Sequence, residues 1–171
     1  MGRWRPPPKA GSPYITAAGA AALRAELQRL WSAERRPVVE ALAAAAAEGD
    51  RSENAEYTYR KKQLGEIDRR IRYISKRLDI LKVVREAPAD QTRIRFGAAV
   101  TLQAAQAEPR QYRIVGVDET RASEGWISVD SPLARALLGK SAGDDVQVEL
   151  PAGRERYEIL EVAYPDFGDT A

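Results

Sequence analysis

The chain has 171 residues, of which 44% are hydrophobic and 30% charged, as expected for a soluble globular protein with one large domain or two small ones. Cysteine and histidine are both absent, which excludes disulfides, thiolate nucleophiles, histidine-based catalytic triads and Cys/His zinc sites. No apolar run approaches the length of a membrane span, and the N-terminus lacks a signal-peptide pattern, so we expect a cytoplasmic protein with no membrane partner. Any chemistry must therefore use carboxylates, hydroxyls, Lys, Arg or a hard cation.

Charge is divided unevenly along the chain. Residues 1–90 contain 18 Lys/Arg and 12 Asp/Glu, a net charge of +6, whereas residues 91–171 contain 9 and 13, a net charge of −4. A basic first half favours a polyanionic partner, although solvated helix faces alone also produce such a split.

The N-terminal residues 1–13 form a segment of their own. They combine four prolines with Arg3, Arg5 and Lys9, which predicts a disordered basic extension. Regular structure should begin at Tyr14, with Thr16 as the N-cap of the first helix.

A first helical stretch is predicted over residues 17–48. Pro37 lies inside the pattern and should kink or break the helix. The apolar stripe of this stretch consists of Leu23, Leu27, Leu30 and Leu42.

A second helix, from residue 53 to about 85, carries the clearest periodic signal. Gly65 should weaken this helix by roughly 1 kcal/mol relative to alanine. Because only a short turn separates the two helical stretches, we expect them to pack as an antiparallel coiled-coil hairpin over residues 14–88. A coiled-coil arm that serves only dimerisation stays open as an alternative. The apolar residues alternate between three- and four-residue steps, as in a heptad seam: Leu64, Ile67, Ile71, Ile74, Leu78 and Leu81.

The turn at residues 49–57 gathers three carboxylates at three-residue spacing, those of Asp50, Glu53 and Glu56. Gly49 can close the first helix, and Asp50 with Glu53 can form a capping box at the start of the second. Alternatively the tip is a partial metal site that a partner completes, because Mg²⁺ is often held by one or two carboxylates plus water and phosphate. From spacing alone the capping role is favoured.

The second helix also carries eight Lys/Arg against two Asp/Glu over residues 60–77. Tyr57 and Tyr59 lie between the acidic tip and these cations. Lys and Arg beside aromatic residues suit single-stranded nucleic acid, and a solvated coiled-coil face is the competing interpretation.

From about residue 89 the pattern changes to short runs rich in β-branched and aromatic residues. Five strands are predicted, at residues 99–102, 112–117, 126–129, 145–150 and 157–162. A short helix should follow the N-cap Ser131 and end before Gly139. The predicted fold class is therefore α+β, with an N-terminal antiparallel helical hairpin followed by a small antiparallel sheet with one short helix over residues 89–171.

The acidic residues of the second half lie at predicted strand ends and turns. We interpret them as turn and capping residues, since no phosphate-binding glycine loop or nucleophile elbow accompanies them. They are Asp118, Glu119, Asp130, Asp144 and Asp145.

These segments together resemble the GreA/GreB family of transcript cleavage factors of bacterial RNA polymerase, its GreB branch more than its GreA branch. The likeness covers residues 14–165, and its most specific part is GDRSENAEY at residues 49–57. Further similar segments are YRKK at 59–62, EIDRRIRY at 66–73, YRIVG at 112–116, ISVDSP at 127–132 and ARALL at 134–138. The extension at residues 1–13 is not part of the family pattern.

The resemblance implies a C-terminal domain of FKBP-like fold that docks at the rim of the polymerase secondary channel, while the coiled coil enters the channel. Asp50 and Glu53 match the family's two tip acids, which would hold a catalytic Mg²⁺ jointly with polymerase and orient the attacking water. Glu56 is a third candidate, and no metal is expected to bind to this protein alone. The extruded 3′ end of the nascent RNA would be held by Arg60, Lys61, Lys62, Arg69, Arg70 and Arg72.

The protein implied is a monomeric accessory factor, not an enzyme, which activates the polymerase's own cleavage of backtracked RNA. An inhibitory Gre-like regulator of the same channel is the alternative. The FKBP-like fold also suggests prolyl isomerase activity as an alternative, but we do not expect the protein to have this activity.

Overall fold

Two compact units make up the described part of the chain. The computed structural model describes residues 11–47, 54–105, 107–151 and 153–165. One unit is a helical hairpin, Ala20–Leu81, and the other combines residues 11–19 with 82–165. These limits differ from the sequence-based boundaries at residues 14 and 88, because the segments on either side of the hairpin pair with each other in the second unit. None of the described helices combines the length and the apolarity that crossing a membrane needs.

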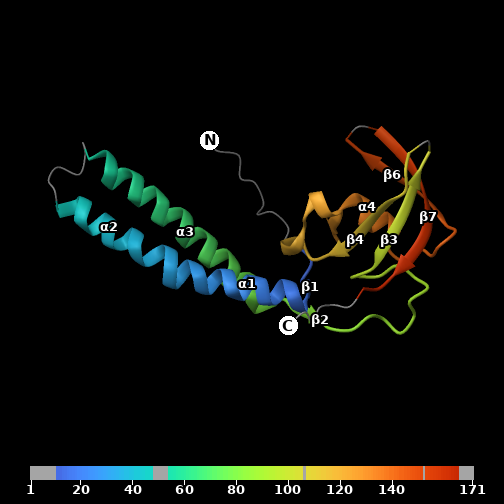
Figure 1. Ribbon diagram of the computed structural model, residues 1–171, viewed down its shortest axis with the longest axis horizontal. Coiled ribbons are helices and arrows are strands. Elements are labelled where there is room, and N and C mark those ends of the chain that lie inside the picture. The colour runs from blue at the N-terminus through green and yellow to red at the C-terminus, as the bar shows by residue number, and fades with distance from the viewer. Residues whose placement is uncertain (1–10, 48–53, 106, 152, 166–171) are drawn as a thin grey trace, which may run out of the picture. The chain divides into compact units, whose positions relative to one another are not determined.

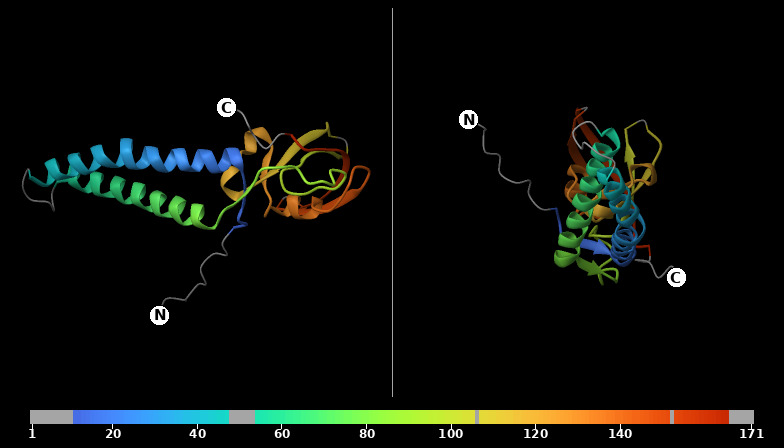
Figure 2. Two further views of the ribbon diagram at one scale, coloured as in Figure 1. Left: turned by 90° about the horizontal axis from the view of Figure 1, so that it is seen from below. Right: turned by 90° about the vertical axis from the view of Figure 1, so that its left-hand side faces the viewer.

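The hairpin has two helical arms that lie side by side and run in opposite directions (Figures 1 and 2). The first arm consists of α1 (Ala17–Arg29), the short π-helix η1 (Leu30–Arg35) and α2 (Arg36–Ala47). The second arm is α3 (Ala55–Ile80). The predicted antiparallel hairpin is confirmed, although α3 ends earlier than residue 85, because Leu81 is extended and leads into a strand.

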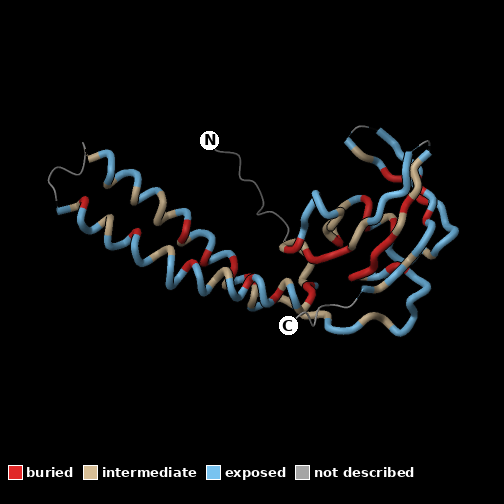
Figure 3. Tube along the Cα trace, in the orientation of Figure 1, coloured by how far each residue is buried: buried red, intermediate tan, exposed pale blue. Residues whose placement is uncertain are grey.

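The second arm has one stripe of buried residues, coloured red in Figure 3. Ile67, Ile71 and Ile74 form this stripe, as the heptad pattern predicts, and Leu64 and Leu78 are half-buried. Within the described part of α3, no side chain before Ile67 is buried. The apolar seam therefore thins toward the start of α3.

The first arm buries a different set of residues from the one predicted. Leu23 and Leu30 are buried as expected, but Val38 and Ala45 continue the stripe, whereas Leu27 and Leu42 are only half-buried. The steps between the buried positions are seven, eight and seven residues. An extra residue in a heptad seam would rotate the following side chains away from the partner helix.

The π-helix absorbs this extra residue. Its i→i+5 hydrogen bonds place one more residue in a turn than an α-helix does, and η1 lies within the eight-residue step between Leu30 and Val38. Pro37 comes two residues after the end of η1. Proline donates no backbone hydrogen bond and crowds the preceding turn. The disturbance predicted at Pro37 thus takes the form of a widened turn, and the helix continues through the proline.

Gly65 has open space around it in α3. A Cβ added there would meet only the Arg69 guanidinium, at 3.7 Å. We expect Gly65→Ala to raise the free energy of unfolding of the hairpin by about 1 kcal/mol, measured as a higher midpoint in a thermal melt followed by circular dichroism. Gly19→Ala is the control and should lower the midpoint, because its Cβ would overlap the Glu119 carboxylate. A lower midpoint for Gly65→Ala would contradict the conclusion that Gly65 has room for a Cβ and weakens α3.

The second unit is built on a five-stranded sheet with the strand order β5-β4-β3-β7-β6. All five predicted strands are present, and the bounds of β6 agree with the prediction. The strands are β3 (Ala99–Ala104), β4 (Arg110–Val115), β5 (Trp126–Ser128), β6 (Asp145–Leu150) and β7 (Gly153–Ala163).

The predicted short helix is also confirmed. α4 (Pro132–Leu137) follows Ser131, whose side chain accepts a hydrogen bond from the N–H of Ala134. Gly139 lies just past its end with φ of 82°, a conformation that glycine adopts without strain. The helix packs against β6 and contributes to the core of the unit. That core consists of Ile94, Ala98, Val100, Leu102, Ile114, Val129, Leu133, Ala134, Leu137, Val146, Val148, Tyr157 and Ile159.

Three of the four strand pairs in this sheet are antiparallel, as predicted, and the fourth differs, because β4 and β5 run parallel. Parallel neighbours need a longer connection than a hairpin turn, and residues 116–125 supply it. This connection contains two 3₁₀ turns, η2 (Val117–Glu119) and η3 (Ala122–Glu124). Gly125 ends the connection with φ of 72° and passes close to Gln111, whose carbonyl oxygen would lie 2.5 Å from an added Cβ.

A second, two-stranded sheet joins the segments that lead into and out of the hairpin. β1 (Tyr14–Thr16) and β2 (Lys82–Val84) pair in parallel, and the Lys82 N–H donates to the Pro13 carbonyl at 2.8 Å. The sequence did not predict β2, because residues 82–84 lie within the stretch assigned to the second helix.

Candidate functional site

The two predicted tip acids, Asp50 and Glu53, lie outside the described residues. The described structure continues at Asn54, which is the N-cap of α3. Its Oδ1 accepts a hydrogen bond from the N–H of Tyr57 at 3.0 Å. The prediction that Asp50 caps this helix is therefore wrong, because Asn54 directly precedes the first turn and its side chain accepts the hydrogen bond from the N–H there.

Asn54 also reaches the other arm. Its Nδ2 donates to the carbonyl oxygen of Ala45, in the last turn of α2, at 2.8 Å. One side chain thus satisfies an N–H at the start of one helix and a carbonyl at the end of the other. Sequence reasoning missed this residue, although Asn is among the preferred N-caps and Asn54 directly precedes an uninterrupted helical pattern.

Glu56, the third candidate acid, lies in the first turn of α3. Its carboxylate forms an i,i+4 ion pair with Arg60, with Oε1 and Nε 2.7 Å apart. A carboxylate near a helix N-terminus is favourable in any case. This arrangement favours a local structural role for Glu56.

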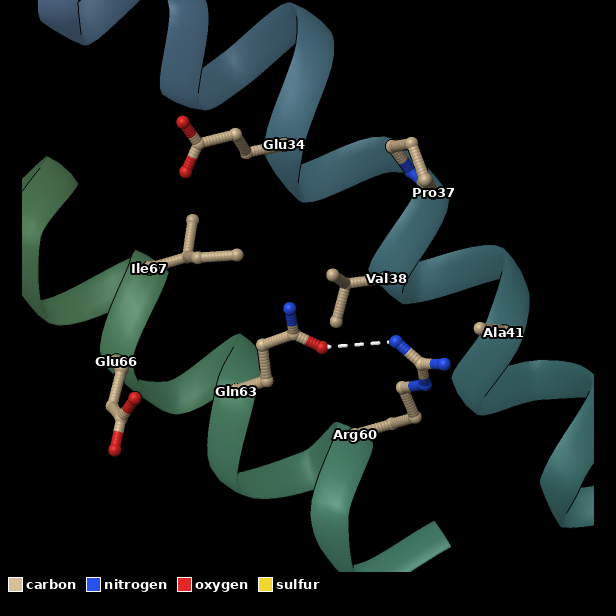
Figure 4. Close-up of a pocket in the computed structure, with 8 residues that line it drawn as sticks. All are labelled: Glu34, Pro37, Val38, Ala41, Arg60, Gln63, Glu66 and Ile67. Atoms are coloured by element: carbon tan, nitrogen blue, oxygen red, sulfur yellow. Dashed lines mark hydrogen bonds between the residues drawn. The ribbon is translucent and has the colours of Figure 1, made fainter. Parts of the chain in front are cut away.

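Arg60 lies between the two arms rather than on the outer face of α3. Figure 4 shows its side chain reaching toward Ala41, in a groove of about 690 Å³ where Val38 and Ile67 face each other. The guanidinium donates to Gln63 at 3.2 Å and lies 5.4 Å from the centre of the Tyr59 ring. Arg60 therefore lines the groove between α2 and α3, where the apolar seam has thinned.

Arg70 links the two arms by a bidentate ion pair. Its Nε and Nη2 donate to the two carboxylate oxygens of Glu26 on α1, at 2.7 and 2.8 Å. The hydrogen bond from Arg70 holds the pKa of Glu26 below its ordinary value. The guanidinium also lies 5.3 Å from the centre of the Tyr73 ring. A bidentate arginine–carboxylate pair has a defined geometry, so Arg70 serves to connect α3 to α1.

The remaining predicted RNA-binding cations are exposed. Lys61, Lys62, Arg69 and Arg72 form no ion pair with any residue in the described ranges. With 3.6 residues per turn, they share with Lys76 the face of α3 opposite the buried Ile67, Ile71 and Ile74. We call these five residues, Lys61, Lys62, Arg69, Arg72 and Lys76, the cation strip.

The cation strip is long and carries little opposing charge. It extends about 22 Å along the helix at ~1.5 Å per residue. Two acids border it: Asp68, whose carboxylate is paired with Arg35 of the first arm at 2.8 Å, and the exposed Glu66. The exposed rings of Tyr59 and Tyr73 lie along the same helix. Exposed cations beside aromatic rings are the combination that single-stranded nucleic acid needs.

A metal site is not found within the described residues, where no three acidic side chains are grouped to hold an ion. The predicted Mg²⁺ ligands, Asp50 and Glu53, lie outside those residues. Two carboxylates are donors that Mg²⁺ accepts, but they fill only part of an octahedral shell. Their chemistry therefore fits a site shared with a partner.

The acids of the second unit mostly serve as predicted. Asp130 accepts from the Ser12 N–H at 2.7 Å, and Asp144 from the Ser141 N–H at 2.9 Å. Asp145 pairs with Arg156 across two strands. Glu119 also acts as a cap, since its Oε2 accepts from the Gly116 N–H at the start of η2 at 3.0 Å, but its carboxylate is buried. No local sequence signal distinguishes this glutamate from a surface turn residue.

A pocket of about 280 Å³ in the second unit is lined by Tyr112 and Tyr157 together with Glu108, Arg110 and Glu155. Burial, and a hydrogen bond to Glu155, raise the pKa of Tyr157 to about 12. Pockets that recognise small apolar groups have few charged side chains, so this lining does not favour the prolyl isomerase alternative.

Comparison with known proteins places both units in one family. The model described as "Transcription elongation factor, N-terminal" matches residues 13–83, and "Transcription elongation factor, GreA/GreB, C-term" matches residues 89–164. The chain is 59% identical to transcription elongation factor GreB of Xanthomonas axonopodis pv. citri and 54% identical to that of Pseudomonas aeruginosa. Each match covers 96% of this chain and 98% of the relative.

Solved structures similar to this chain include the GreA factor homolog Gfh1 of Thermus thermophilus. The two share 21% sequence identity, with a TM-score of 0.42, over 88% of this chain and 97% of the other. The sequence matches, which span both units, identify the protein: the chain belongs to the GreA/GreB family of transcription elongation factors.

Proposed function

We propose that this protein enters the secondary channel of bacterial RNA polymerase and stimulates the polymerase's own Mg²⁺-dependent cleavage of backtracked RNA. Its family, and relatives named as transcription elongation factors, support polymerase as the partner. In this proposal the second unit docks at the rim of the channel and the hairpin enters it. The protein acts in the cytoplasm as a monomeric accessory factor and is not itself an enzyme.

The tip acids Asp50 and Glu53 would share an Mg²⁺ ion with ligands of polymerase. When bound, such an ion stabilises negative charge in the transition state and lowers the pKa of water. The two carboxylates would supply oxygen ligands and accept a hydrogen bond from the attacking water, which orients it.

The N-cap of α3 is the observation that carries this assignment. Because Asn54 caps the helix, neither tip acid is needed to start α3. The capping role, which residue spacing alone favours, therefore loses its main support. The carboxylates are then best explained by chemistry that a partner completes.

The direct test is RNA cleavage in stalled, backtracked elongation complexes, with the full-length protein added at increasing concentration. We expect Mg²⁺-dependent cleavage to accelerate and elongation to restart. Slower cleavage and slower elongation would support the inhibitory alternative. A protein that binds polymerase and changes neither rate would overturn both proposals.

The cation strip should bind the extruded RNA. A variant in which Lys61, Lys62, Arg69 and Arg72 are all replaced by Gln should crosslink weakly to the RNA 3′ end and stimulate cleavage poorly. The dependence of log affinity on log salt should fall by about 0.7 per lost phosphate contact. We assign Arg60 and Arg70 to the hairpin instead, since both are engaged between or along its arms.

A matched control for this variant is the replacement of Arg24, Arg36, Arg154 and Arg156 by Gln. These residues are exposed and the change in net charge is the same, but none belongs to the cation strip. If both variants lose RNA crosslinking equally, net charge rather than the strip attracts the RNA.

A further inference from the structure

Glu119 is a buried carboxylate that the proposed function does not use. It ends η2 and is only 8% exposed. Its Oε2 accepts hydrogen bonds from the N–H groups of Thr16 and Gly116, each at 3.0 Å, and its Oε1 accepts from the Thr16 hydroxyl. These three bonds compensate a charge that has been removed from water.

The Thr16 hydroxyl carries this contact into α1. While it donates to Glu119, its oxygen accepts from the N–H of Gly19 at 3.0 Å, which makes Thr16 the N-cap that the sequence predicts. The first turn of α1 contains no acidic residue. Glu119, 103 residues away in sequence from Thr16, therefore supplies the negative charge that a helix N-terminus favours.

Two glycines make room for the carboxylate. A Cβ at Gly19 would overlap Glu119, and a Cβ at Gly116 would lie 2.6 Å from the Tyr14 carbonyl oxygen and 2.8 Å from Glu119 Oε2. Glycine lowers the stability of a helix by roughly 1 kcal/mol relative to alanine. The close approach of Glu119 explains why glycine occupies a position in the first turn of α1.

The neighbouring strands hold the same region of the chain. Thr16 is the last residue of β1 and pairs with Val84 of β2, and Ile15 beside it is fully buried. Lys82, the first residue of β2, comes two residues after the end of α3. The chain is thus anchored where it enters the hairpin and where it leaves.

We propose that Glu119 is a positioning residue for transcript cleavage, because its carboxylate holds Thr16, the N-cap from which α1 starts. This inference rests on the proposed function. The first arm is roughly 45 Å long at ~1.5 Å per residue, so a change of about 5° at its root moves its far end by about 4 Å. A displacement of about 1 Å in a catalytic group can lower a rate by about a hundredfold.

The test begins with a measurement that does not depend on polymerase. The chain has no cysteine, so Ala43→Cys on α2 and Gln147→Cys on β6 create two unique, exposed sites for spin labels. Pulsed electron resonance then gives the distribution of distances between the labels. We expect Glu119→Gln and Thr16→Val to broaden this distribution by about twofold or more. Glu124→Gln, which removes an exposed acid of the neighbouring turn, should leave it unchanged.

The second measurement is cleavage in backtracked complexes, at a temperature where all variants are folded. Glu119→Gln should lower the cleavage rate by about tenfold or more, while its affinity for polymerase stays within about twofold of wild type. Thr16→Ser keeps the hydroxyl and should cleave like wild type. Because the two residues act through one contact, the double variant Glu119→Gln/Thr16→Val should lose little more than either single variant.

Two outcomes would overturn the positioning role, and a third would overturn only the proposed function. An unchanged distance distribution in Glu119→Gln overturns the positioning role. So does a cleavage defect that disappears when Gly65→Ala restores stability, since Glu119 would then be only structural. If wild type fails to stimulate cleavage, the proposed function fails, and the distance measurement still decides whether Glu119 fixes α1.

Discussion

Asp50→Asn and Glu53→Gln are each expected to lower the stimulation of RNA cleavage by roughly a hundredfold, the loss typical of removing one group that stabilises transition-state charge. Both changes remove a negative charge and keep the shape of the side chain. Because the N-cap of α3 is Asn54, neither change should alter the thermal midpoint of the hairpin. The measurement is the cleavage rate at saturating factor, with polymerase binding followed separately.

Asn54→Ala is the matched control for the tip acids. It removes the cap of α3 and leaves the Tyr57 N–H and the Ala45 carbonyl without this partner, at a cost of about 0.5–2 kcal/mol. Below its lowered thermal midpoint, cleavage by this variant should stay within a few-fold of wild type. Acid variants that cleave like wild type, or that lose stability as Asn54→Ala does, would return the carboxylates to a capping role.

Ile74→Ala should be the most destabilising single change in the hairpin. Ile74 is fully buried in the stripe that α3 presents to the first arm. Truncating a buried isoleucine to alanine costs about 2–5 kcal/mol, since it loses apolar burial and leaves a cavity. Thermal unfolding followed by circular dichroism at the helical band should show the hairpin melting at a much lower temperature.

Hydrogen exchange can separate the two units in this experiment. Amides of the sheet, such as those of Val100 and Leu102, should keep their protection in Ile74→Ala, because they belong to the core of the second unit. Ile80→Ala is the control at the end of the same helix, where the side chain is 49% exposed, and should cost less than about 1 kcal/mol. Equal destabilisation by the two changes would contradict the observed seam.

Local pattern was enough wherever a structure depends on residues close in sequence. The three- and four-residue steps of Ile67, Ile71 and Ile74 predicted the buried stripe of α3, because helix geometry alone places them on one face. Ser131 and Gly139 marked the limits of α4 by their capping preferences. The segment at residues 49–57 pointed to the family that the comparisons show.

Local sequence pattern was therefore sufficient to predict the helical hairpin, the five strands of the sheet, the short helix between β5 and β6, and the family. Contacts between residues distant in sequence set which residues form the seam of the first arm and which polar groups pair. Because of the π-helix, the first arm buries Val38 and Ala45 in place of Leu42. Arg60 lines the groove between α2 and α3, and Arg70 pairs with Glu26. Asn54 donates a hydrogen bond to the carbonyl of Ala45, and Glu119 accepts one from Thr16, 103 residues away in sequence. These contacts join residues that no helical or strand period relates, so only the folded chain brings them together.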